Sequence, residues 1–303
     1  MTRPGRLSVV DQLKAKRDEL LRQVSELDAD LNDLTGEIDP SQAPVHARDF
    51  VRESGEFEWI VGSLIAEGSV TMVAAEPRLG KTTLLVQMAL CLSAGQKFLD
   101  FHVPRPARTL YILAEGSRHA FRARFRTACD SLRLDPDGVD WWIQPAGEMD
   151  FQLRGNHVER LVAASGAKLV ILDTLGYFHG GDENDASEWK RRVMAPLRSM
   201  AVRHGCAFVL VHHYGKSVPG RSRWERGRGS SAMFGDVDHW LGLERVELTT
   251  EEQQRSDAEK DRLSQRRELF IEKNKYGLDD YSVRLEFWKP RGTFALEGDP
   301  CPL

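Results

Sequence analysis

Apolar and polar positions follow two different patterns along the chain. Between residues 7 and 38, apolar residues recur in steps of three and four, and neither proline nor glycine occurs between Leu7 and Gly36. A narrow apolar stripe of this kind is typical of a helix that pairs with another helix, so we predict an N-terminal coiled coil. The alternative is an amphipathic helix that packs on its own globular domain. The stripe, which only Arg17 interrupts, comprises Val10, Leu13, Leu20, Val24, Leu27, Leu31, Leu34 and Ile38.

After this stripe the pattern changes to short apolar runs separated by amphipathic stretches. The segment DPSQAP, 39–44, carries two prolines and ends the helix, so we predict domains at 1–44 and 45–303. Continuous apolar runs are typical of buried parallel strands joined by crossover helices. The runs are 69–75, 108–115, 167–175, 206–213, 239–248 and 267–274. Segment 281–288 follows the last run after a turn at Gly277, which indicates antiparallel strands at one edge. We therefore predict an α/β fold with an open, mostly parallel sheet and sites at the strand ends.

Composition narrows the class of protein. Hydrophobic residues make up 41% of the 303-residue chain and charged residues 29%, so a sizeable core is expected. The net charge of −4 excludes a uniformly basic DNA-coating protein, and any nucleic-acid contact must come from a local patch. The four cysteines have no C-x-x-C spacing, and neither a signal-peptide core nor an 18-residue apolar run occurs. We expect a cytoplasmic protein without a membrane span.

The segment AEPRLGKT, residues 75–82, nearly matches the phosphate-binding loop G-x-x-x-x-G-K-[ST], with Ala75 in place of the first glycine. It follows an apolar run and begins a helix, which is the context that the motif needs; the alternative is a chance match. Lys81 is expected to bind the β- and γ-phosphates of ATP, and Thr82 to bind Mg²⁺. The residues predicted to surround the nucleotide are Ala75, Glu76, Pro77, Arg78, Leu79, Gly80, Lys81, Thr82 and Thr83.

Three further runs end in polar residues. Asp173 ends a buried run and is predicted to hold Mg²⁺, although an acid there also caps helices. Glu115 emerges in the same way and is predicted to orient or deprotonate water; the alternative is a loop acid. His212 and His213 end the run 206–213 on opposite faces of the sheet. Alternation does not tell which histidine contacts the γ-phosphate. We predict His213, with His212 as a buried, hydrogen-bonded residue.

The order of these motifs resembles the RepA-type hexameric replicative helicases, a branch of the RecA/DnaB-like ATPases. The matching pieces are EPRLGKTTL, LYILAEG, LVILDTLGYFHGGDENDAS, LVHHYGK, RGSSA and EKNKYG, which lie between residue 59 and about residue 280. The resemblance implies a RecA-like P-loop NTPase core that uses ATP and Mg²⁺. It also implies a homo-oligomeric, hexameric ring that acts as a helicase or translocase on single-stranded DNA in plasmid, phage or mobile-element replication.

The same resemblance implies roles for residues outside the loop. Arg228 matches an arginine finger that completes a neighbouring subunit's site, while Lys273 and Lys275 stand where relatives have K-x-R, with Lys273 the better candidate. The acidic loop 176–189 and the basic loop 214–231 match loops that face the central channel. DNA-binding residues are then expected at Lys216, Arg221, Arg223, Trp224 and Arg226.

Two features depart from the family, namely Ala75 and the N-terminal helix, which offers a site for a protein partner. Two other functions therefore remain open. One is an ATP-switched recombination or loading factor that binds DNA without unwinding it. The other is a partner-regulated ATPase that does not act on nucleic acid, as in signalling or defence.

Overall fold

The computed structural model describes residues 16–17, 20, 23, 27, 44–52, 58–145, 157–178, 185–213 and 230–299. The chain divides into two compact units, Met1–Glu56 and Phe57–Leu303. In the first unit the five described positions up to residue 27 are helical, and α2 spans Ala47–Arg52. Leu20 and Leu27, which belong to the predicted stripe, are 48% and 66% exposed. The rest of the stripe and residues 39–43 of the predicted linker lie outside the described residues, so coiled-coil pairing stays a prediction.

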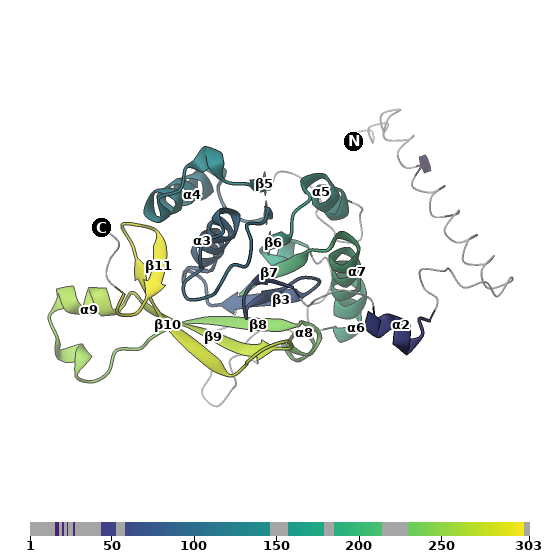
Figure 1. The fold of residues 1–303 in the computed structure, drawn as a ribbon. Coiled ribbons are helices and arrows are strands. Elements are labelled where there is room, and N and C mark those ends of the chain that lie inside the picture. The colour runs from purple at the N-terminus through teal and green to yellow at the C-terminus, as the bar shows by residue number, and fades with distance from the viewer. Residues whose placement is uncertain are drawn as a thin grey trace, which may run out of the picture. The chain divides into compact units, whose positions relative to one another are not determined.

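In the described part of the second unit, nine strands form one sheet in the order β11-β10-β9-β8-β3-β7-β6-β4-β5 (Figure 1). The strands from β8 to β5 in this order are parallel, and β8, β9, β10 and β11 are joined by antiparallel pairs. The predicted α/β fold with antiparallel strands at one edge is confirmed. The strands are β3 (Val70–Ala75), β4 (Thr109–Leu113), β5 (Trp141–Pro145), β6 (Leu169–Asp173), β7 (Ala207–His213), β8 (His239–Arg245), β9 (Arg266–Asn274), β10 (Tyr281–Trp288) and β11 (Thr293–Leu296). A separate hairpin joins β1 (Trp59–Val61) and β2 (Ile65–Ala66).

Helices cover both faces of the sheet (Figure 1). One face carries α3 (Lys81–Ala94) and α4 (Arg118–Leu132), and the other carries α5 (His157–Ser165), α6 (Ala186–Trp189) and α7 (Ala195–His204). Among the described residues, no helix combines the length and apolar character that crossing a membrane requires. The remaining elements are α8 (Ser230–Asp236), α9 (Asp257–Leu263), a π-helical turn (Lys190–Met194) and 3-10 turns at Pro136–Gly138, Leu175–Tyr177 and Glu252–Gln254.

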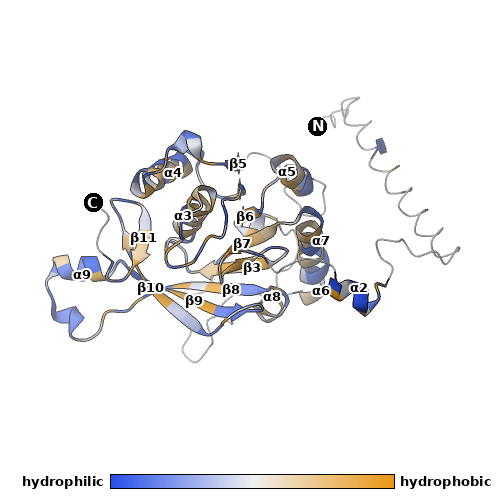
Figure 2. Cartoon of the chain, viewed as in Figure 1, coloured by the Kyte–Doolittle hydropathy of each residue, from blue (hydrophilic) through white to orange (hydrophobic). Residues whose placement is uncertain are grey.

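The pleat of the strands divides the apolar side chains between two cores. In β3, Val73 and Ala75 face the core beneath α3, whereas Met72 and Ala74 face the core beneath α7. Apolar residues, drawn in orange in Figure 2, accordingly concentrate on the central strands and on the inner sides of the helices. The same alternation continues to the end of β7, so that His213 falls on the face that carries α3.

Candidate active site

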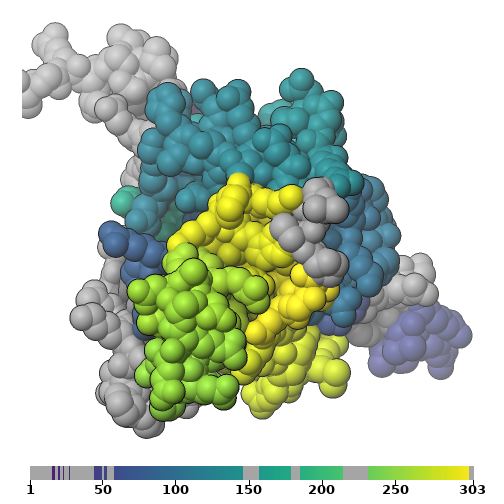
Figure 3. Space-filling view, turned by 90° about the vertical axis from the view of Figure 1, so that its left-hand side faces the viewer, coloured from purple at the N-terminus to yellow at the C-terminus, as the bar shows by residue number. Residues whose placement is uncertain are grey.

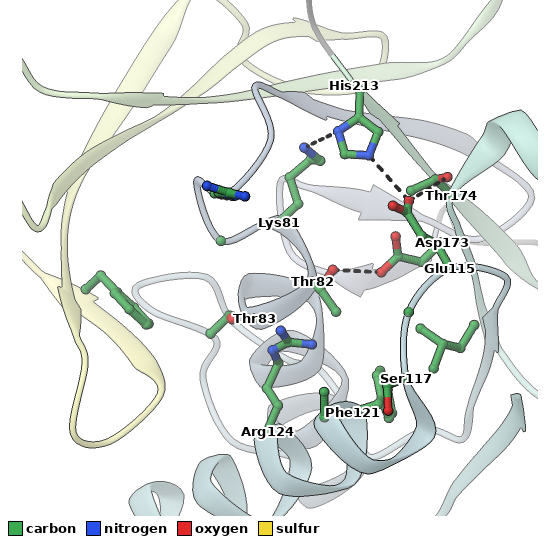
Figure 4. Close-up of a pocket in the computed structure, with 16 residues that line it drawn as sticks. Lys81, Thr82, Thr83, Glu115, Ser117, Phe121, Arg124, Asp173, Thr174 and His213 are labelled. Atoms are coloured by element: carbon green, nitrogen blue, oxygen red, sulfur yellow. Dashed lines mark hydrogen bonds and ion pairs between the residues drawn. The ribbon is translucent and has the colours of Figure 1, made fainter.

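Four chain segments meet at the carboxyl edge of the parallel strands. The loop after β3 lies beside the end of β7, because Ala75 pairs with His213, and β4 ends beside β6, because Leu113 pairs with Asp173. Together with α4 and β10 they enclose a cleft of about 470 Å³ (Figure 4). The cleft is lined by Arg78, Gly80, Lys81, Thr82, Thr83, Leu113, Glu115, Gly116, Ser117, Ala120, Phe121, Arg124, Asp173, Thr174, His213 and Phe287.

The loop backbone is shaped to receive an anion. Gly80 has a φ of 104°, a left-handed conformation that glycine adopts readily, and it caps α3 without any side-chain hydrogen bond. The first N–H groups of a helix have no partner within the helix, so they are available to phosphate oxygens. Ala75 ends β3, where it is fully buried and does not have a positive φ. Alanine therefore fits at the position where the motif has its first glycine.

Lys81 is buried at the centre of the cleft. Its ammonium donates to the carbonyls of Ala75 (2.8 Å) and Glu76 (3.1 Å), and it lies 3.1 Å from Nδ1 of His213. Burial lowers the pKa of Lys81 to about 8, although Asp173, Glu115 and Glu76 act to raise that pKa. The three donors of the ammonium are thus occupied by protein acceptors, and its charge is poorly solvated.

The contact with Lys81 also defines which ring nitrogen of His213 carries the proton. Because an ammonium only donates hydrogen bonds, Nδ1 must accept, and the proton of the neutral ring then lies on Nε2. That nitrogen faces Oε2 of Glu115 at 3.6 Å, and the same carboxylate oxygen accepts a hydrogen bond from the Thr174 hydroxyl (3.3 Å). His213 therefore joins the lysine of the phosphate loop to Glu115, the predicted catalytic carboxylate.

Asp173 is 3% exposed and contacts Thr82, the second residue of α3. Its Oδ2 accepts hydrogen bonds from the Thr82 hydroxyl (2.9 Å) and from the Tyr111 hydroxyl (2.6 Å). Burial raises the pKa of Asp173, although the hydrogen bonds from Tyr111 and Thr82 act to lower it. A hydroxyl and a carboxylate within bonding distance of each other provide the oxygen ligands that Mg²⁺ prefers, so these side chains fit the predicted metal.

Several residues of the cleft were not predicted. Ser117 is the N-cap residue of α4, and Phe121 and Arg124 lie on α4 itself. Their spacings of four and three residues place them on one side of a helix, which the sequence could have indicated. Figure 4 shows Arg124 reaching into the cleft. Tyr111, which does not itself line the cleft, lies two residues before Leu113 on the same face of β4, and its hydroxyl donates to Asp173. Phe287 comes from the antiparallel part of the sheet, and nothing in the local sequence indicated its place in the cleft.

Other predicted residues lie elsewhere. Of the predicted loop residues, Arg78, Gly80, Lys81, Thr82 and Thr83 line the cleft, while Ala75 and Leu79 are buried. Glu76 and Pro77 are not among the lining residues. Residues Lys216, Arg221, Arg223, Trp224, Arg226 and Arg228, and the middle of the acidic loop, lie outside the described residues.

The surroundings of His212 and Lys273 could not be predicted from the sequence. His212 is buried on the opposite face from the cleft, and its Nε2 has no hydrogen-bond partner among the described residues, so the predicted hydrogen bond is absent at that nitrogen. Burial lowers the pKa of His212 to about 4. Lys273 does not line the cleft and donates to the carbonyls of Phe234 (2.6 Å) and Gly235 (2.9 Å). Its role as a finger for a neighbouring subunit stays a prediction.

The C-terminal strands support the phosphate loop from behind. The buried side-chain amide of Gln87 both donates to the Phe294 carbonyl (2.8 Å) and accepts from the Phe294 N–H (2.7 Å). The Phe294 ring lies so close to Gly80 that an added Cβ would come within 2.7 Å of it. Arg267 donates to the carbonyl of Leu79 (3.4 Å). In Figure 3 these strands, in yellow, lie beside the teal segment that contains α4.

The strand, the Gly-Lys-Thr loop, the helix that follows and the carboxylates on neighbouring strand ends define the class as a RecA-like P-loop nucleoside triphosphatase. Comparison with known families gives a match of residues 37–218 to an AAA domain family. The chain belongs to this family.

Solved structures support the fold. The ATPase domain of G40P superposes with a TM-score of 0.56 at 16% identity, over 76% of this chain and 85% of that one. A DnaB-like replicative helicase, determined with its interactions with primase, gives 0.58 at 17% identity over 93% of this chain and 75% of that one. The RadB recombinase gives 0.51 at 15% identity over 76% and 91%. At these identities the likeness concerns the fold.

Proposed function

We propose that the protein is a Mg²⁺-dependent ATPase that works as a ring on single-stranded DNA. The observation that carries the ATPase part is the meeting of Lys81, Thr82, Asp173, Glu115 and His213 in one cleft at the start of α3. Sites of this composition bind the phosphates through the loop and direct water with a carboxylate. The ring and DNA parts rest on the ordered motifs of the sequence and on the likeness in fold to a DnaB-like replicative helicase.

Each side chain has a distinct task in hydrolysis. Lys81 exchanges its backbone carbonyl partners for phosphate oxygens when ATP enters. Thr82 and Asp173 would hold Mg²⁺, whose charge would offset the negative charge of the phosphates. Glu115 orients the attacking water and accepts its proton, and the contacts from Thr174 and His213 keep this carboxylate in place.

His213 offers a route from the nucleotide to DNA. It is the last residue of β7 and contacts both Lys81 and Glu115. The basic loop 214–231 begins at the next residue in the sequence. A change at the γ-phosphate that moves His213 would therefore be passed directly into the segment predicted to bind DNA.

The test is ATP turnover with and without single-stranded DNA. Lys81→Ala should abolish turnover under both conditions, and Asp173→Asn should slow it strongly under both. Arg221→Ala combined with Arg223→Ala should leave basal turnover intact while it weakens DNA binding and flattens its salt dependence, because phosphate contacts release counterions. DNA-stimulated turnover without strand separation would instead support a loading or recombination factor. An ATP turnover rate that does not change when single-stranded DNA is added would support an ATPase regulated by a protein partner.

A mixing experiment tests the ring. Lys81→Ala and Arg228→Ala subunits should each be inactive alone. After subunit exchange, some interfaces combine the intact loop of one chain with the intact arginine of the other, so part of the activity should return. If activity does not return although exchange is demonstrated independently, Arg228 does not act on a neighbouring subunit.

A further inference from the structure

Arg78 occupies an unusual backbone position in the phosphate loop. Its φ of 66° lies in the left-handed region, which side chains other than glycine adopt only against steric repulsion. Two other residues with positive φ line the same cleft, and both are glycines: Gly80 (104°) and Gly116 (99°). The chain therefore holds an arginine at a place where glycine would fit the backbone better.

The side chain of Arg78 is available for binding. It is exposed, it lines the cleft, and its guanidinium forms no hydrogen bond or ion pair with any described residue. Lys81 is different, because its ammonium already contacts two backbone carbonyls and His213. Arg78 thus combines a strained backbone with a positively charged side chain that has no partner among the described residues of the cleft. Strain that is retained at such a position indicates that the side chain itself has a function.

We propose that the Arg78 side chain binds the phosphate groups of the nucleotide, in addition to the backbone N–H groups of the loop. This inference rests on the proposed ATPase function. A guanidinium matches phosphate oxygens with paired donors and stays charged at all working pH values, whereas the ammonium of Lys81 is a single point of charge. Arg78 thus gives each subunit an arginine for its own nucleotide, independently of any arginine that a neighbouring subunit supplies.

The backbone conformation provides a discriminating test. Arg78→Gly removes the guanidinium and at the same time relieves the left-handed strain, so the variant should fold at least as well as the wild type. Arg133→Gly is a matched control, since Arg133 is also an exposed arginine with a φ of 57°, at the end of α4 and outside the residues that line the cleft. Both changes remove one positive charge and relieve the same kind of backbone strain.

The measurement is the dissociation constant of Mg²⁺-ATP for the full-length chain, together with the midpoint of thermal unfolding. Arg78→Gly should bind ATP about tenfold more weakly, the effect of losing one charge-assisted hydrogen bond, with an unchanged or higher unfolding midpoint. Arg133→Gly should bind ATP as the wild type does. Arg78→Lys should recover part of the loss, because lysine keeps the charge without the paired donors.

The outcomes separate this proposal from the proposed function. Wild-type affinity in Arg78→Gly, with Lys81→Ala impaired, would overturn the role of Arg78 alone. An equal loss in Arg78→Gly and Arg133→Gly would also overturn it, because the effect would then come from net charge. Equal affinity in the wild type and Lys81→Ala would overturn the nucleotide site, and with it the role of Arg78.

Discussion

Raising the pH from 7 to 9.5 should weaken ATP binding, because Lys81 loses its proton in the empty site. Burial lowers the pKa of this lysine from 10.5 to about 8. Phosphate oxygens beside the ammonium stabilise its charged form, so the bound complex keeps the proton up to a much higher pH. Above pH 8, binding must therefore take up a proton, and the affinity becomes dependent on pH.

The size of the effect follows from that pKa. At pH 9 about one empty site in eleven still carries the proton, so ATP should bind about tenfold more weakly than at pH 7, with a further tenfold per pH unit. The stability of the empty protein should change in the opposite direction. The pKa of Lys81 is lower in the folded than in the unfolded chain, so its charge destabilises the fold below pH 8. This penalty of about 3 kcal/mol disappears as the pH rises from about 8 to 10.5.

Calorimetric titration at constant free Mg²⁺, in two buffers of different ionisation enthalpy, measures both the affinity and the protons taken up. The phosphates of ATP are already ionised in this range. Burial raises the pKa of Cys91 and Cys206 to about 12 and that of Cys129 to about 11, so these thiols stay protonated. A Lys81→Arg variant that still binds ATP should show no pH dependence. Constant affinity in the wild type from pH 7 to 9.5, without proton uptake, would refute the reasoning.

Three further changes test the supports of the site. Asp173→Asn should still bind ATP but hydrolyse it at least about a hundredfold more slowly, because Mg²⁺ is held less well; normal single-turnover rates would contradict the assignment. Tyr111→Phe deletes the 2.6 Å hydrogen bond to Asp173 and should raise the Mg²⁺ concentration for half-maximal turnover about tenfold or more, whereas an unchanged Mg²⁺ titration would exclude a positioning role. Gln87→Leu leaves the buried N–H and carbonyl of Phe294 without their partner, and urea unfolding should show a loss of about 2–4 kcal/mol; a loss below 1 kcal/mol would show that these bonds are not needed.

Much of the parallel sheet could be predicted from the sequence. The apolar runs 69–75 and 206–213 correspond to β3 and β7 within one residue at either end. Segment 281–288, for which antiparallel pairing was predicted, coincides with β10. Strands that are buried on both faces are recognisable in the sequence because most of their side chains are apolar. Strand β5 was missed because Trp142 and Ile143 are half exposed at the sheet edge, and β11 because it has only four residues.

Site residues could be predicted from the sequence where they belong to short motifs or to a single strand. Lys81 and Asp173 belong to motifs, and strand alternation places His212 and His213 on opposite faces. Which face carries α3 is a property of the tertiary fold, so only the structure identifies His213 as the residue at the cleft. Phe287 and Phe294 reach the site through antiparallel pairing late in the chain, and no short-range pattern encodes that register.

The support of the phosphate loop by β11 has a consequence for biosynthesis. The hydrogen bonds between Gln87 and Phe294 join residues that are 207 positions apart. At roughly 5–20 residues per second, the ribosome takes on the order of 10–40 s to add the intervening chain. Throughout that interval the nascent protein carries a complete Gly-Lys-Thr sequence, but its phosphate loop lacks the contact with β11. Contacts between residues so far apart in the sequence also form slowly. The phosphate loop therefore gains this support only after residue 294 has been added to the chain.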